Sequence, residues 1–193
     1  MDISVKQVLD ELEAFGVEND AVQAERSKKL LNLEPETAQL LSIIARSSKR
    51  KHLLEIGTSN GYSTIWLAWC ARATGGHVIS IDNNPEKTTM AQSNLERTGL
   101  RDLVTLKTGN AADILQELTE PIDFVFLDAD RESYPAYFDL LLPKLSPDAL
   151  ILADNVNSHP DEIAGYIKLI SDREDFDHVV ADVGKGLSIA YRR

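Results

Sequence analysis

The sequence has few basic residues and only one cysteine. Its 193 residues contain 20 Lys and Arg against 31 Asp and Glu, which gives a formal net charge of −11. Because nucleic-acid phosphates are bound by clustered Lys and Arg, this deficit argues against a nucleic-acid partner, and it also disfavours an anionic membrane surface. A lone Cys70 excludes an internal disulfide framework and a cysteine zinc site.

Long apolar segments are absent as well. No apolar run approaches the ~20 residues that span a bilayer, and residues 1–30 lack the apolar stretch with basic flanks that marks a signal peptide. The composition, 43% apolar and 26% charged, is typical of a globular domain, and the length fits one domain. We therefore expect a soluble cytoplasmic protein with a single domain over residues 1–193.

Residues 1–48 are predicted to form a helical cap, and residues 49–193 a separate core. Ser4 is the expected N-cap of a first helix that Gly16 ends. A second helix is predicted over Asp20–Leu31, and a third begins at Pro35 and carries its apolar positions between residues 37 and 47.

From residue 51 short apolar runs alternate with helical stretches. Strands are predicted at His52–Ile56, His77–Ile81, Leu103–Lys107, Ile122–Leu127 and Leu150–Ala153, and helices at about 61–73, 85–98, 111–118, 133–145 and 160–172. This alternation predicts an α/β fold with a mostly parallel, doubly wound sheet covered on both faces. Residues 177–182 and 187–191 predict an antiparallel hairpin at the C-terminus.

Acidic residues recur at the ends of the predicted strands. Glu55 lies near the end of the first strand, Asp82 follows the second, Asp128 the fourth and Asp154 the fifth. In an open parallel sheet these positions share the carboxyl edge, where ligands bind. Because clustered carboxylates repel one another and are costly to bury unpaired, we infer a cationic ligand, a metal, or both.

The turn after the first predicted strand contains two glycines, Gly57 and Gly61. A glycine turn from a strand into a helix lets a ligand approach the backbone amides at the helix N-terminus. Asp82, 25 residues beyond Gly57, suits the two hydroxyls of a ribose. The turn lacks the dinucleotide fingerprint G-x-G-x-x-G, because Ser59 occupies its second glycine position, which disfavours an NAD-dependent oxidoreductase.

Four segments resemble cation-dependent class I O-methyltransferases, the family that includes catechol and caffeoyl-CoA O-methyltransferases. They are LLEIGTSNGYST (53–64), FLDADRESYPAY (126–137), LILADNV (150–156) and GLSIAY (186–191). The resemblance runs from about Leu33 to the C-terminus and implies a Rossmann-like methyltransferase fold. It also implies S-adenosylmethionine as the methyl donor, a small hydroxylated acceptor such as a catechol, and a homodimer.

The resemblance also assigns roles to residues. Asp82 would take the ribose hydroxyls and Ser63 the methionine carboxylate. The remaining cofactor-binding positions would be Leu33, Glu55, Gly57, Thr58, Asn83, Ala111 and Asp128. The family's metal ligands fall on Asp128, Asp154 and Asn155, whose hard oxygens suit Mg²⁺ or Ca²⁺.

One departure from the family concerns catalysis. Arg131 stands where the family usually has Lys, and arginine effectively cannot lose its proton. We expect Arg131, with Asp128, to act in catalysis by orienting an acceptor oxygen or stabilising its negative charge. A metal-independent methyltransferase and a non-catalytic cofactor-binding module remain alternatives.

Several of these residues also have purely structural interpretations. Asp82 could cap the helix that begins near Pro85, and Asp154 with Asn155 could form an Asx turn. Tyr134 and Tyr137 suit core packing as well as the family motif.

Overall fold

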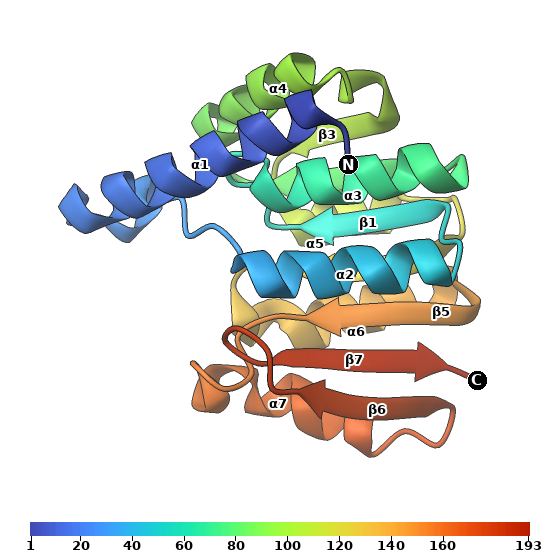
Figure 1. Ribbon diagram of the computed structural model, residues 1–193. Helices are drawn as coiled ribbons and strands as arrows, with labels where there is room; N and C mark the ends of the chain where they lie inside the picture. The colour runs from blue at the N-terminus through green and yellow to red at the C-terminus, as the bar shows by residue number, and fades with distance from the viewer.

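A seven-stranded sheet organises the chain, which the computed structural model describes over all 193 residues (Figure 1). Its strands are β1 His52–Ile56, β2 His77–Asp82, β3 Val104–Thr108, β4 Ile122–Leu127, β5 Leu145–Ala153, β6 Phe176–Ala181 and β7 Leu187–Arg192. The spatial order is β3-β2-β1-β4-β5-β7-β6, and β7 alone runs opposite to the other strands. The predicted fold class, a mostly parallel α/β sheet with an antiparallel C-terminal hairpin, is confirmed.

Helices cover both faces of this sheet. They are α1 Ile3–Val22, α2 Pro35–Ser47, α3 Tyr62–Thr74, α4 Pro85–Thr98, α5 Ala111–Glu117, α6 Tyr134–Leu141 and α7 Pro160–Ser171. Figure 1 shows α2 and α3 in front of the sheet and α5, α6 and α7 behind it, with α1 lying across α3 and α4. None of these helices is both long enough and apolar enough to cross a membrane.

The core has two layers because neighbouring residues of a strand point to opposite faces. Leu53 and Phe124 pack with α1–α4, whereas the next residues along, Leu54 and Val125, pack with α5–α7. The strands therefore read as continuous apolar runs, as expected for a parallel sheet buried on both sides.

The N-terminal helices differ from the prediction. Helix α1 does not end at Gly16 but continues to Val22, and its N-cap is Asp2 rather than Ser4. A Cβ at position 16 would lie 2.5 Å from Nδ2 of Asn32, so this glycine serves the close approach of a neighbouring segment and not a helix stop. The separate helix predicted over residues 20–31 was wrong, since α1 ends at Val22 and only a short 3₁₀ turn, Arg26–Lys28, follows it.

Two further predicted boundaries were wrong. Strand β5 begins at Leu145, not Leu150, because Leu145 pairs with Ile122 before an irregularity in the ladder. The helix predicted over 133–145 divides into α6 and two flanking 3₁₀ turns, Arg131–Ser133 and Leu142–Lys144.

Backbone hydrogen bonds align the carboxyl ends of the parallel strands. The residue after a strand donates its N–H to the last or next-to-last residue of the neighbouring strand: Gly57 to Ile81 (2.9 Å), Asp128 to Ile56 (2.9 Å) and Asp154 to Leu127 (3.0 Å). The loops after β1, β2, β4 and β5 therefore begin at one level. The order of the strands reverses between β1 and β4, which is where ligands bind in sheets of this kind.

Gly57 is the tightest point of this edge. Its φ is +114°, and a Cβ there would overlap the backbone carbonyl of Asp128. Gly57→Ala should therefore lower the free energy of unfolding by at least about 3 kcal/mol, from backbone strain and overlap together, as measured by urea denaturation. Gly75→Ala is the matched control, because Gly75 also has positive φ (+70°) but nothing lies near its Cβ position. Equal losses in the two variants would contradict the close approach at Gly57.

Candidate active site

A cavity of about 1040 Å³ opens at the carboxyl edge of the sheet. Its volume exceeds that of most single-ligand sites, so it has room for a cofactor together with a small second molecule. It is lined by most of the predicted site residues: Leu33, Gly57, Thr58, Ser63, Asp82, Asn83, Ala111, Asp128, Arg131, Asp154 and Asn155. Of the predicted set, only Glu55 does not line it.

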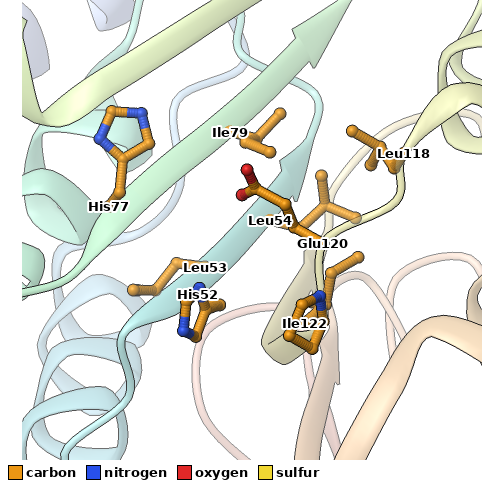
Figure 2. Close-up of a pocket in the computed structure, with 9 residues that line it drawn as sticks. His52, Leu53, Leu54, His77, Ile79, Leu118, Glu120 and Ile122 are labelled. Atoms are coloured by element: carbon orange, nitrogen blue, oxygen red, sulfur yellow. The ribbon is translucent and has the colours of Figure 1, made fainter.

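A second cavity, at the opposite edge of the sheet, is too small to be a substrate site. It has a volume of about 30 Å³, room for a water molecule or two, and lies at the amino ends of β1 and β2. Figure 2 shows the imidazole rings of His52 and His77 well apart on its wall. No three His, Cys, Asp or Glu side chains gather as a metal site anywhere in the protein.

Asp82, at the end of β2, joins two loops of the large cavity. Its carboxylate accepts hydrogen bonds from the backbone N–H of Ser59 (2.8 Å) and of Asn84 (2.9 Å). It does not cap α4, since Asn84 does so by accepting from the N–H groups of Glu86 and Lys87. The helix-cap alternative for Asp82 was therefore wrong.

Residues 30–33 form one wall of the cavity and are held in place by hydrogen bonds. The carboxylate of Asp20 accepts from the N–H groups of Leu30 (2.7 Å) and Leu31 (2.8 Å). The hydroxyl of Ser59 donates to the carbonyl of Leu30 (2.6 Å). These bonds fix the segment that carries Leu33 at the cavity wall and tie it to the glycine turn.

Glu55 lies beneath the cavity and is fully buried in β1. Its carboxylate accepts hydrogen bonds from the hydroxyls of Ser63 (2.5 Å), Thr64 and Ser80 (2.6 Å). Burial raises the pKa of Glu55 from 4.5 to about 7, although the three hydrogen bonds act in the opposite direction and lower it. The hydroxyl of Ser63 is thus engaged with Glu55 and not directed at the cavity.

Asp128 and Asp154 follow the paired strands β4 and β5, in which Leu127 lies opposite Ala153. Burial raises the pKa of Asp128 to about 6 and that of Asp154 to about 7, the latter raised further by the charge of Asp128. The amide Nδ2 of Asn155 donates to Oδ1 of Asp128 (3.1 Å). Oδ1 of Asp154 is buried with no hydrogen-bond partner, which is costly for a carboxylate.

Arg131 lines the cavity but is bound to another residue of the chain. Its Nε donates a hydrogen bond to Oε2 of Glu162 on α7 (2.7 Å), Nη2 forms an ion pair with the same oxygen (2.5 Å), and the residue is only 5% exposed. Its expected contact with an acceptor oxygen stays a prediction.

Of the two tyrosines, Tyr134 is wholly buried, packs edge-on against Tyr166 and accepts from the N–H of Ala129 (3.0 Å). Tyr137 is half-buried and lines the cavity. Tyr134 therefore packs in the core and supports the loop after β4, whereas the role of Tyr137 at the cavity stays a prediction.

Two charged residues of this region were missed from the sequence. Lys185, in the turn between β6 and β7, lines the cavity, and its Nζ lies 2.6 Å from Oε1 of Glu34. The only sequence signal is a lysine between two glycines, Gly184 and Gly186, in the hairpin turn.

Comparison with known proteins agrees with this geometry. The O-methyltransferase family model matches residues 3–165. A catechol O-methyltransferase of Niastella koreensis is 38% identical over 152 residues, covering 74% of this chain and 68% of that protein. One of Mycobacterium tuberculosis is 38% identical over 121 residues, 61% of this chain and 54% of that protein.

Solved structures show the same likeness. An O-methyltransferase of Bacillus cereus in complex with SAH (S-adenosylhomocysteine) has a TM-score of 0.83 at 29% identity, covering 97% of this chain and 91% of that one. The O-methyltransferase of tomaymycin synthesis from Streptomyces achromogenes, in complex with SAM (S-adenosylmethionine), has a TM-score of 0.79 at 28% identity, covering 100% and 90%.

The protein defined by this fold and cavity is a methyl-transferring enzyme with a Rossmann-like sheet. The chain belongs to the O-methyltransferase family. This confirms the predicted family and enzyme class, and it favours methyl transfer over the oxidoreductase and the non-catalytic module.

The buried Glu55 carboxyl predicts a pH-dependent stability. Between pH 4.5 and about 7 the folded state holds a proton at Glu55 that the unfolded state has lost, so this group's stabilising contribution falls as the pH rises. In Glu55→Gln the decline of the unfolding free energy between pH 5 and 7, followed by urea denaturation, should become shallower. Glu117→Gln makes the same chemical change at an exposed position. If the Glu55 variant keeps the wild-type slope, the assignment is wrong.

Proposed function

We propose that this O-methyltransferase transfers a methyl group from S-adenosylmethionine to a hydroxyl of a small, catechol-like acceptor, with a divalent cation at Asp128, Asp154 and Asn155. The observation that carries the proposal is the buried, unpartnered Oδ1 of Asp154 beside Asp128, in a cavity large enough for two ligands. Catechol acceptors are proposed because two of the relatives are named catechol O-methyltransferases.

The cofactor fits the half of the cavity around Asp82. The carboxylate of Asp82 accepts one hydrogen bond from each of two backbone N–H groups. Its remaining lone pairs can accept hydrogen bonds from the ribose hydroxyls. Asn83 and Ala111 line the wall beyond it, where the adenine would lie. At the other end, the N-terminus of α3 is favourable for the methionine carboxylate.

The polar atoms of the other half of the cavity, around Asp128, Asp154 and Asn155, suit a divalent cation. Two carboxylates and one amide oxygen form a hard donor set, and a bound cation would offset the repulsion that raises the pKa of Asp154. Asn155 now directs its amide N–H at Asp128, so it must turn its oxygen toward a cation to bind it. Because no third acidic side chain completes the group, the site depends on that amide.

The chemistry is an in-line displacement in which the acceptor oxygen takes the methyl group and the sulfonium becomes a neutral thioether. When bound, the divalent cation lowers the pKa of the acceptor hydroxyl and holds it in place. The chain contributes alignment, because Asp128 lies at the junction of the two halves and the bonds at the strand ends fix its position.

The ribose contact is tested by Asp82→Asn. An amide keeps one acceptor oxygen but loses the charge and the second oxygen. The affinity for S-adenosylhomocysteine, measured by calorimetry, should fall by at least about tenfold, since hydrogen bonds to charged groups contribute about 1.5–3 kcal/mol. Asp102→Asn, at an exposed acid outside the cavity, is the control. An unchanged affinity in the Asp82 variant would move the ribose contact elsewhere.

The cation site is tested by Asp154→Asn. Binding of Mn²⁺ and methylation of a catechol should both be lost, while the free energy of unfolding without metal should stay equal or increase, because the repulsion by Asp128 is removed. In the wild type EDTA should abolish methylation and Mg²⁺ restore it. Full activity in EDTA would instead support the metal-independent alternative.

A further inference from the structure

Lys185 is fixed at the cavity by the packing of its turn. The backbone carbonyl of Lys185 accepts from the N–H of Asn157 (2.8 Å), and that of Gly186 accepts from Val156 (3.0 Å). Gly184 has positive φ, and a Cβ there would overlap the hydroxyl of Thr37 on α2. The turn is therefore wedged between the start of α2 and the loop that carries Asn155.

The side chain of Lys185 faces the acidic residues of the site. Its Nζ forms an ion pair with Oε1 of Glu34, and the other carboxylate oxygen, Oε2, is buried without a hydrogen-bond partner. The charge of Lys185 acts on Asp128 and Asp154 and lowers the pKa of both, while Glu34 raises them. Glu34, Asp154 and Asp128 in turn raise the pKa of Lys185, so the ammonium keeps its proton.

Lys185 also differs from Arg131, the other cation of this part of the cavity. Arg131 is 5% exposed and is held to Glu162 by a hydrogen bond from Nε and an ion pair from Nη2. The Lys185 side chain keeps 40% of its surface exposed and pairs with Glu34 alone, so two of its three N–H donors are free. Lys185 can therefore meet an acceptor molecule without breaking its ion pair.

We propose that Lys185 is a second cation of the acceptor site, where its ammonium stabilises the ionised acceptor hydroxyl and weakens binding of the divalent cation. The inference rests on the proposed function, since it requires an acceptor and a cation beside Asp128 and Asp154. The hydroxyl proton passes to solvent water, and Lys185 keeps its own. Glu34 is the positioning residue that holds the ammonium beside the two aspartates.

This role gives two effects of opposite sign when the charge at position 185 is removed. In Lys185→Gln, Mn²⁺ should bind about tenfold more tightly, because one nearby positive charge has been lost. The pKa of bound 4-nitrocatechol, an acceptor whose ionisation is read from its absorbance, should nevertheless rise by about 1. Mn²⁺ binding is measured by electron paramagnetic resonance without acceptor, and the absorbance titration is made with S-adenosylhomocysteine and saturating metal.

Two controls separate this role from a structural one. Lys185→Arg keeps the charge and should stay near the wild type in both measurements. Lys51→Gln removes an exposed lysine before β1, at the opposite edge of the sheet, and should change neither.

Glu34→Gln tests the positioning role of Glu34. It should weaken Mn²⁺ binding, since it removes a negative charge and releases the Lys185 ammonium toward the aspartates.

The outcomes distinguish this inference from the proposed function. If the wild type binds neither Mn²⁺ nor 4-nitrocatechol, the proposed function fails. If it binds both, and Lys185→Gln matches the wild type in metal affinity and in the pKa of the bound catechol, the role of Lys185 is overturned. A Lys185→Gln variant that binds metal more weakly would overturn it as well.

Discussion

The cavity is organised around the repulsion between two neighbouring carboxylates, the partly buried Asp128 and the buried Asp154. Paired strands place them at one sheet edge, where burial raises the pKa of both and the charge of Asp128 raises that of Asp154 further by repulsion. Such an arrangement destabilises the protein without a partner, and natural proteins retain that cost mainly at functional sites. We infer that a cation bound between the two carboxylates would offset this repulsion and that the other cavity residues surround it.

The scaffold keeps the two aspartates together despite that repulsion. Their backbone N–H groups are bound to the neighbouring strands, and Gly57 allows the glycine turn to pass directly over the carbonyl of Asp128. The same turn is tied to residues 30–33 through Ser59 and Leu30. A sulfonium cofactor and a divalent cation would therefore meet at a point that the main chain, rather than flexible side chains, determines.

Much of this could be predicted from the sequence, because strand ends are visible as apolar runs followed by an acid. Asp82, Asp128 and Asp154 all lie where that reasoning puts them, and all line one cavity. Glu55 was expected at the cofactor, but it does not line the cavity. It lies within β1, whereas Asp128 and Asp154 follow their strands, so its side chain is enclosed in the core.

The remaining differences arise from tertiary packing. The local sequence predicts a helix end at Gly16, but this glycine instead makes room for Asn32, which is distant in sequence. The pairing of Lys185 with Glu34 joins residues about 150 positions apart through the packing of a hairpin turn on α2, and no local pattern encodes it. Arg131 was expected at the acceptor, and only the structure places Glu162 beside it.

The central claim, that the carboxylates of one sheet edge gather to bind a cation next to the cofactor, is tested most directly by anomalous diffraction. Crystals grown with S-adenosylhomocysteine and Mn²⁺ should show one anomalous peak between Asp128, Asp154 and Asn155, with the ribose of the cofactor on Asp82. A cofactor bound there with no anomalous peak, and with the ammonium of Lys185 between the two aspartates, would contradict the account.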